Sequence, residues 1–249
     1  MAFPLITAHT GCMGEPDNTA GSARAGIALG ADIVEDDIRV TRDGVPVLFH
    51  DEIVTLKDGT QLGISSSSYE ELRRVDMIPA HASSSETIRL GTLDELLAIV
   101  RDAGRRVNLD IKVNEAIAPA AAAVRKYGLE DQAFLSGCGA DRVLLAEAEA
   151  PWLPRLLNAD AEWFLTLTYS EAMKRTIEAA KAASCFGINI HHRLVRKELV
   201  ASAGDCGLPI YAWTVDEPDQ MAALAAMGVR SVTTRRVDLA MELKRGQRR

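Results

Sequence analysis

The sequence predicts an α/β fold, a (β/α)8 TIM barrel, and two observations carry this prediction. Short β-branched or apolar runs alternate with amphipathic stretches rich in Ala and Leu, and the alternation repeats along the chain. The chain has 249 residues, a length typical of one such barrel, so we expect residues 1–249 to form a single domain. A doubly wound sheet is the alternative, but it predicts a glycine-rich phosphate fingerprint after an early strand. The segment HTGCMGEP is too irregular to be that fingerprint.

Each expected strand precedes an expected helix. We expect strands at Leu5–His9, Ile33–Thr41, Arg106–Lys112, Ala133–Ser136, Arg155–Asn158, Cys185–Ile190, Ile210–Val215 and Arg230–Thr234. We expect helices at Thr19–Leu29, Leu93–Ala103, Ala116–Tyr127, Asp141–Ala148, Glu171–Ala183, Lys197–Ala203, Pro218–Met227 and Val237–Lys244. Several helices end at a glycine suited to a C-cap: Gly30, Gly104, Gly128 and Gly228. The fifth strand has the weakest pattern.

Residues 51–86 interrupt this alternation and predict a small insertion after the second strand. The segment contains a hairpin-like run around Asp58-Gly59, a short helix candidate at Tyr69–Val75 and a serine-rich tract at Ser83–Ser85. It follows a strand that we expect to end at His50, on the face where barrel enzymes keep their active sites. The insertion is therefore either a rim or lid of the site or a variable surface excursion.

The composition is that of a globular protein and excludes two classes of partner. The formal net charge is −7, and an acidic surface repels both nucleic acid and anionic membranes. No apolar run approaches the roughly 20 residues that span a bilayer, so we expect no stable membrane insertion. A small anionic substrate remains compatible if a metal ion and a few cations reverse the field inside one cleft.

The cysteines and the N-terminus indicate a cytoplasmic protein. The four cysteines form no CxxC pair and have no zinc-like spacing, which favours reduced thiols over a disulfide framework: Cys12, Cys138, Cys185 and Cys206. The first residues, MAFPLITAHT, lack the basic and apolar regions of a secretory signal.

Ionisable residues gather at the ends of the expected strands, where barrel enzymes place reactive groups. These are His9, Glu35, Asp37, His50, Asp51, Asp110 and Lys112. Glu35 and Asp37 are two residues apart and face the same side of a strand, whereas Asp36 faces away. Paired carboxylates inside a barrel mouth repel one another unless a cation neutralises them, and oxygen ligands suit Mg2+ or Ca2+. Asp110 and Lys112 repeat this spacing on the next strand.

Each of these motifs alone has a structural explanation. A His-Asp pair is usually a turn, an ExD pair is often a solvated strand edge, and a DIK run is often a salt-bridged strand end. Their shared position at several strand ends favours a functional site.

The same residues carry a family resemblance. The segments PDNT (16–19), GADIVEDDIRVTRDGVPVLFHDE (30–52), LDIK (109–112), AWTVDEPDQM (212–221) and GVRSVTT (228–234) resemble the glycerophosphodiester phosphodiesterase family. The resemblance spans nearly the whole chain, and the ordered combination of ExD, TRDGVPVLFHD and DIK is its most specific part.

The resemblance implies roles for particular residues. It implies four ligands for a divalent metal ion: Asp17, Glu35, Asp37 and Asp110. It implies an acid/base pair of histidines and a phosphate-facing lysine: His9, His50 and Lys112. Trp213 matches an aromatic residue that lines the family's substrate pocket, or it is a packed barrel residue.

Several positions depart from the family pattern. Thr10 replaces an arginine that clamps phosphate, and Asp17 and Asp110 replace longer glutamates. In the last strands, Asp216 replaces an asparagine and Arg235 replaces an aspartate. Arg235 either binds the substrate phosphate in compensation for Thr10 or faces solvent in a basic cluster. For the His191-His192 pair, which follows the sixth strand, we favour a plain loop position over a substrate or metal contact.

Three functions follow from this reading. The first is metal-dependent hydrolysis of a glycerophosphodiester, a small-molecule substrate, to sn-glycerol 3-phosphate and an alcohol. The second is the same chemistry on another phosphodiester, such as a sugar phosphodiester, which the altered phosphate-binding positions favour. The third is a catalytically weakened barrel that binds a metabolite, and the retained His9, His50 and Lys112 speak against it.

Overall fold

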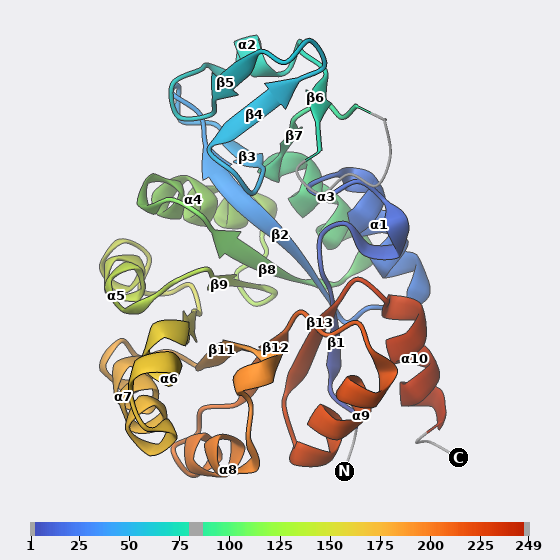
Figure 1. Cartoon of the computed structure of the whole chain (residues 1–249). Helices are drawn as coiled ribbons and strands as arrows, with labels where there is room; N and C mark the ends of the chain where they lie inside the picture. The colour runs from blue at the N-terminus through green and yellow to red at the C-terminus, as the bar shows by residue number, and fades with distance from the viewer. Residues whose placement is uncertain (1–2, 80–86, 247–249) are drawn as a thin grey trace.

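The computed structural model describes residues 3–79 and 87–246, and eight parallel strands form a barrel at its centre (Figure 1). These strands are β1 (Leu5–Ala8), β2 (Ile33–Val40), β8 (Arg106–Ile111), β9 (Ala133–Ser136), β10 (Leu156–Asn158), β11 (Gly187–His191), β12 (Ile210–Trp213) and β13 (Ser231–Thr234). β1 pairs with both β2 and β13, and a parallel bridge between Leu135 and Arg155 joins β9 to β10. The ring is therefore closed, and the predicted (β/α)8 barrel is confirmed.

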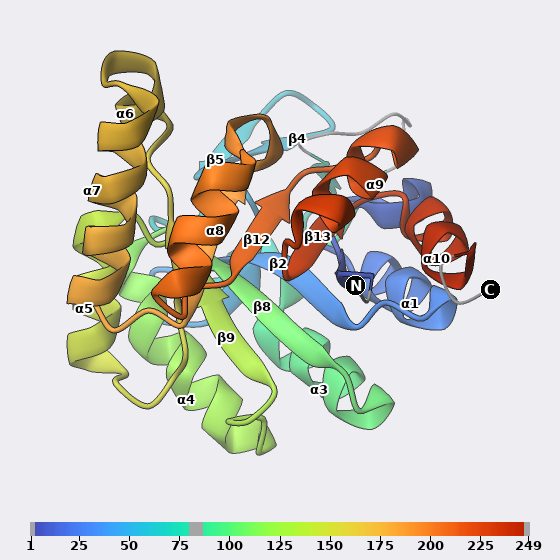
Figure 2. The same ribbon diagram turned by 90° about the horizontal axis from the view of Figure 1, so that it is seen from below.

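Helices surround the strands on the outside, as the two views in Figures 1 and 2 show. They are α1 (Ala20–Leu29), α3 (Leu93–Ala103), α4 (Ile117–Tyr127), α5 (Ala140–Glu149), α6 (Ala161–Thr166), α7 (Tyr169–Ala182), α8 (Lys197–Asp205), α9 (Pro218–Met227) and α10 (Val237–Gly246). Within the described residues, three short 3-10 turns accompany them: η1 (Cys12–Gly14), η2 (Asn114–Ala116) and η3 (His192–Leu194). All eight expected helices are present, and α6 is an addition that the sequence pattern did not predict. The four expected C-cap glycines follow α1, α3, α4 and α9 in left-handed conformation.

The barrel interior changes character along its axis. Its lower layer is an apolar cluster built on Ile33, Phe134, Leu156 and Tyr211. Two residues further along the same strands stand Glu35, Ser136, Asn158 and Trp213. Because side chains alternate along a strand, these four occupy the same interior face one layer higher. An apolar floor thus supports a polar layer at the carboxyl end of the barrel, while a larger cluster packs the strands against the helices.

The predicted insertion forms a small unit with its own core. It contains a second sheet of β4 (Ile53–Leu56), β5 (Gln61–Gly63) and β6 (Met77–Ile78), and a short helix, α2 (Tyr69–Leu72). Gly59, with φ of 85°, makes the tight turn of the expected β4–β5 hairpin. The expected helix ends three residues earlier than Val75, and the Ser83–Ser85 tract lies outside the described residues.

The strand expected to end at His50 is β3 (Pro46–Leu48), which ends two residues earlier. It is not one of the eight barrel strands, because it runs antiparallel to β2 and to β7 (Gly91–Thr92). β2 is eight residues long and continues past the barrel rim, and its extension provides the edge on which β3 pairs.

Two sequence expectations about the wider molecule can be compared with the structure. None of the described helices combines the length and the apolar content needed to cross a bilayer. All four cysteines carry free thiols, three buried and one, Cys206, exposed.

Candidate active site

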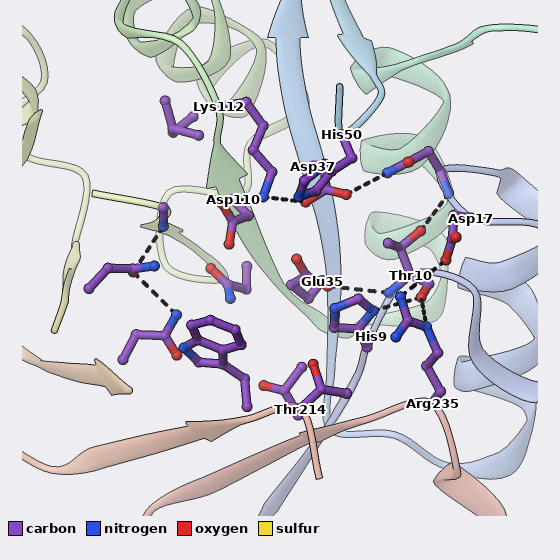
Figure 3. Close-up of a pocket in the computed structure, with 18 of the residues that line it drawn as sticks. His9, Thr10, Asp17, Glu35, Asp37, His50, Asp110, Lys112, Thr214 and Arg235 are labelled. Atoms are coloured by element: carbon purple, nitrogen blue, oxygen red, sulfur yellow. Dashed lines mark hydrogen bonds and ion pairs between the residues drawn. The ribbon is translucent and has the colours of Figure 1, made fainter. Parts of the chain in front are cut away.

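A cavity of about 400 Å³ opens at the polar end of the barrel (Figure 3). All nine residues expected to be functional line it: His9, Asp17, Glu35, Asp37, His50, Asp110, Lys112, Trp213 and Arg235. Ten further residues complete the lining: Thr10, Asn18, Asn108, Ile111, Gly137, Arg142, Asn158, Asn189, Thr214 and Thr233. Residues more than two hundred positions apart in the sequence thus share one cavity.

Three carboxylates of this cavity lie close enough together to hold a metal ion. Oxygen atoms of Glu35, Asp37 and Asp110 lie within 4.8 Å of one another. The parallel register of β2 and β8 produces this arrangement, since Asp37 stands opposite Asp110. Lys112 Nζ lies 2.9 Å from Asp37 Oδ1 and 3.1 Å from Asp110 Oδ1.

The electrostatics of this carboxylate cluster favour a divalent cation. Burial, followed by repulsion from Asp37, raises the pKa of Glu35, and burial also raises the pKa of Asp110 against the influence of Lys112. Burial opposes ionisation of Asp37 too, but Lys112 and Asn18 outweigh it and leave the Asp37 pKa lowered. Three carboxylates with one ammonium carry two uncompensated negative charges when ionised. Despite its 3.1 Å ion pair, Asp110 Oδ1 also has no hydrogen-bond partner. Hard oxygen ligands with this charge deficit suit Mg2+ or Ca2+.

The two histidines occupy different surroundings. His9 lies inside the cavity, and its Nδ1 is 2.7 Å from the Thr10 carbonyl oxygen. Burial, followed by the charge of Arg235, lowers the pKa of His9 and favours the neutral imidazole. His50 is more open to solvent, with 45% of its side chain exposed, and its Nδ1 lies 2.7 Å from Asp51 Oδ1. Arg39 donates to the His50 carbonyl oxygen at 2.8 Å and so fixes the backbone at the rim.

Thr10, Asp17 and Arg235 form a second polar group in the cavity, visible on the right of Figure 3. Arg235 Nε donates to the Thr10 carbonyl oxygen at 3.2 Å, and an Arg235 terminal nitrogen lies 3.4 Å from Asp17 Oδ1. Asp17, expected as a fourth metal ligand, is therefore not one of the three clustered carboxylates. Arg235 does not simply face solvent, which was the alternative expected from the sequence. Its side chain is 34% exposed, and it lines the cavity.

Comparison with known proteins gives this arrangement a family. Residues 9–239 match the model of the glycerophosphoryl diester phosphodiesterase family. The chain belongs to this family. A glycerophosphodiester phosphodiesterase from Caldanaerobacter subterraneus subsp. tengcongensis is 24% identical over 92% of this chain and 93% of that protein. The chain is thus an enzyme of the phosphodiesterase type, a hydrolase.

Solved structures of similar proteins agree with the fold. A protein from Silicibacter pomeroyi assigned to the same enzyme type superposes with a TM-score of 0.85, at 22% identity, over 99% of this chain and 94% of that one. A phosphodiesterase from Oleispira antarctica, solved in complex with its product sn-glycerol-3-phosphate, superposes with a TM-score of 0.76. It is 22% identical and covers 96% of this chain and 97% of its own.

Sequence reasoning missed several residues of this phosphodiesterase site. Asn18, in the PDNT segment, donates from Nδ2 to Asp36 Oδ1 at 2.7 Å and to Asp37 Oδ2 at 3.0 Å. As expected, Asp36 faces away from Asp37, but it is buried, and burial raises its pKa to about 8. Asn18 lay inside a motif that had already been noticed. It could have been found by a search for the residue that donates a hydrogen bond to Asp37, the second acid of the ExD pair.

No such signal marked Arg142, because it occupies a polar position in the amphipathic pattern of a helix. From α5 it donates to the carbonyl oxygens of Ile111, Gly137 and Lys112 at 2.8, 2.6 and 3.2 Å. It therefore ties the end of β8, which carries the lysine, to the loop after β9.

Trp213 lines the cavity, as expected for a pocket residue, and its ring meets the His191 ring edge-on at 5.2 Å. His191 stacks on His192 with ring centroids 4.5 Å apart, and neither histidine lines the cavity.

Proposed function

We propose that the chain hydrolyses glycerophosphodiesters to sn-glycerol 3-phosphate and an alcohol, with help from a divalent metal ion. The observation that carries the proposal is the group of three carboxylates, two of them buried, beside Lys112 and two histidines in one cavity. The sn-glycerol-3-phosphate complex of the Oleispira antarctica enzyme supports the same product here.

Glu35, Asp37 and Asp110 would hold the metal ion, Mg2+ or Ca2+, which would neutralise charge that develops on the phosphate oxygens. Lys112 adds a positive charge at the same place, since its ammonium already lies among these carboxylates. Arg235 provides a second cation, on the other side of His9 from Lys112 (Figure 3). It takes the phosphate-clamping role that Thr10 cannot fill.

The two histidines fit complementary proton transfers. His9, whose lowered pKa favours the neutral form, accepts the proton of the attacking hydroxyl. His50, whose Nδ1 lies 2.7 Å from Asp51 Oδ1, donates a proton to the leaving alkoxide. The adjacent hydroxyl of the substrate's own glycerol attacks phosphorus, the bond to the head-group oxygen breaks, and water then opens the cyclic phosphate. No protein nucleophile is required.

The test is turnover of glycerophosphocholine by the purified chain with added Mg2+ or Ca2+, followed by removal of metal with EDTA. We expect EDTA to abolish turnover, and His9→Gln and His50→Gln each to lower kcat by about 10²–10⁴-fold. His192→Gln is the matched control, because His192 lies outside the cavity lining. Turnover that survives EDTA, or that is the same in His9→Gln and His192→Gln, would contradict the proposal. Metal binding without turnover of any diester would instead support a metabolite-binding barrel.

A further inference from the structure

The cavity has an amide-rich region that the proposed reaction does not use. Asn108 of β8, Asn158 of β10 and Asn189 of β11 line it together with Trp213 of β12. We propose that this asparagine wall binds a neutral head group rich in hydroxyls, such as a glycerol, an inositol or a sugar. The proposal rests on the phosphodiesterase function above and names the class of diester that the site prefers.

Two atoms of the wall are buried without a hydrogen-bond partner among the described residues. One is Asn108 Oδ1, an acceptor on a residue that is only 5% exposed, and the other is Trp213 Nε1, a donor. An unpaired buried polar group costs about 1–3 kcal/mol, so such groups mark places where a ligand completes the bonding. A hydroxyl both donates and accepts, and a polyol therefore satisfies both kinds of atom at once.

The wall is also held in place before a ligand arrives. Asn158 Oδ1 accepts from the backbone N–H of Gly137 at 3.0 Å and from Asn189 Nδ2 at 3.2 Å. The edge-on contact of the His191 ring at 5.2 Å fixes the Trp213 indole. Polar groups that are already oriented lose little conformational entropy on binding, which favours a specific hydrogen-bonded partner.

The cavity lacks the features that recognise a cationic head group such as choline. Quaternary ammonium groups bind in cages of several aromatic rings, and Trp213 is the single Phe, Tyr or Trp of the described cavity lining. Of the four lining carboxylates, Glu35, Asp37 and Asp110 belong to the cluster proposed to hold the metal ion, and Asp17 lies 3.4 Å from an Arg235 nitrogen. Arg142, another lining residue, adds a positive charge that disfavours a cation.

The experiment compares kcat/KM for glycerophosphoglycerol and glycerophosphoinositol with kcat/KM for glycerophosphocholine, all on the same metal-loaded enzyme. We expect at least one polyol diester to be preferred by about tenfold or more, the value of one to two hydrogen bonds. Trp213→Phe keeps the ring but removes the Nε1–H donor, and Asn189→Ala removes one amide of the wall. Each is expected to reduce this preference by about tenfold.

Asn114→Ala is the matched control, since the Asn114 amide accepts from Arg142 Nε at 2.9 Å and does not line the cavity. Because each preference is a ratio within one preparation, a fraction of unfolded variant does not alter it. Equal or better turnover of glycerophosphocholine in the wild type overturns the wall assignment but leaves the proposed function intact. The assignment also fails if Trp213→Phe and Asn189→Ala lower turnover of all three diesters equally. Absence of turnover of every diester would instead reject the phosphodiesterase proposal on which the inference rests.

Discussion

At the scale of single residues, Asp36 is a buried acid between the cavity-facing side of β2 and the loop that carries Asn18. Its Oδ1 accepts hydrogen bonds from Asn18 Nδ2 at 2.7 Å and from the Asp37 backbone N–H at 3.0 Å. These bonds orient Asn18 toward Asp37, so a carboxyl outside the cavity helps to position one inside it. Burial and the Asp37 charge raise the Asp36 pKa to about 8, which leaves Asp36 protonated in the folded enzyme at neutral pH.

This raised pKa predicts how stability depends on pH. The ordinary pKa of Asp is 3.8 and the folded value is about 8, so the folded chain binds more protons than the unfolded chain between these values. The contribution of Asp36 to the free energy of unfolding is complete below the lower value, and it falls by up to about 1.4 kcal/mol per pH unit as pH rises toward 8. Asp36→Asn keeps both accepted hydrogen bonds and is expected to remove this slope. Urea unfolding of the wild type and of Asp36→Asn at pH 5, 6.5 and 8 in EDTA measures this slope. The same pH dependence of the free energy of unfolding in both proteins would contradict the prediction.

Arg235 is the residue for which the departure from the family pattern has a direct consequence. With Thr10 in place of an arginine, Arg235→Ala is expected to lower kcat/KM for a glycerophosphodiester by about 10–100-fold, the effect of losing one charge-assisted phosphate contact. Arg235→Lys restores the charge but not the planar fork, and is expected to recover part of the loss. Arg236→Ala is the matched control, since Arg236 pairs with Asp238 on the surface. If Arg235→Ala behaves like Arg236→Ala, Arg235 is not the phosphate contact.

At the scale of elements, the sequence predicted those parts of the fold that repeat. The eight barrel strands and their helices share one pattern, and glycines such as Gly104 and Gly128 ended the helices where expected. β7 was missed because a strand of two residues is too short to display alternation, and β3 was expected only through its end, placed at His50 instead of Leu48. His50 was placed correctly at the cavity, but the antiparallel pairing of the strand before it with β2 could not be predicted, because a local sequence pattern does not show which strands pair.

The residues of the site likewise divide into those that a local sequence pattern predicts and those that depend on tertiary packing. Asp37, Asp110 and Lys112 were predictable because spacing along a strand fixes which side chains share a face. The partners that orient them, Asn18 and Arg142, come from a loop and a helix whose approach depends on tertiary packing. Asp17 is not one of the clustered carboxylates and contacts Arg235, more than two hundred residues away in the sequence, and a local pattern does not show such a contact.

The loop after β9 illustrates how an element positions the site. Gly137 has φ of 71°, and a Cβ there would lie 2.2 Å from Asp110 Oδ1 and 2.5 Å from the Ile111 carbonyl oxygen. Gly137→Ala is therefore expected to cost at least about 2 kcal/mol in stability and to weaken divalent-ion binding by displacing Asp110. Gly139→Ala is the control, because a Cβ there meets no atom within 4 Å. Chemical unfolding and metal titration test both variants, and equal behaviour would show that the loop tolerates a side chain.

At the scale of the whole molecule, the carboxylate cluster that forms the proposed metal site lowers the stability of the metal-free fold. Glu35, Asp37 and Asp110 repel one another in a buried place, and burial raises the pKa of Glu35, so the metal-free fold is strained at neutral pH. Glu35→Gln relieves this repulsion and still accepts the Thr10 backbone N–H. It is therefore expected to melt at a higher temperature than the wild type in EDTA.

Addition of Mg2+ or Ca2+ should reverse that order. An ion that binds only the folded state stabilises it by about 2.7 kcal/mol at one hundred times its Kd, which corresponds to several degrees in Tm for a chain of this size. The wild type is expected to gain this increment, whereas Glu35→Gln, with one ligand charge removed, gains little. Glu149→Gln, on the exposed end of α5, is the control and should follow the wild type with and without metal. Thermal melts of the three proteins across a metal titration decide the matter, since a Tm independent of metal in the wild type would mean that the cluster holds no ion.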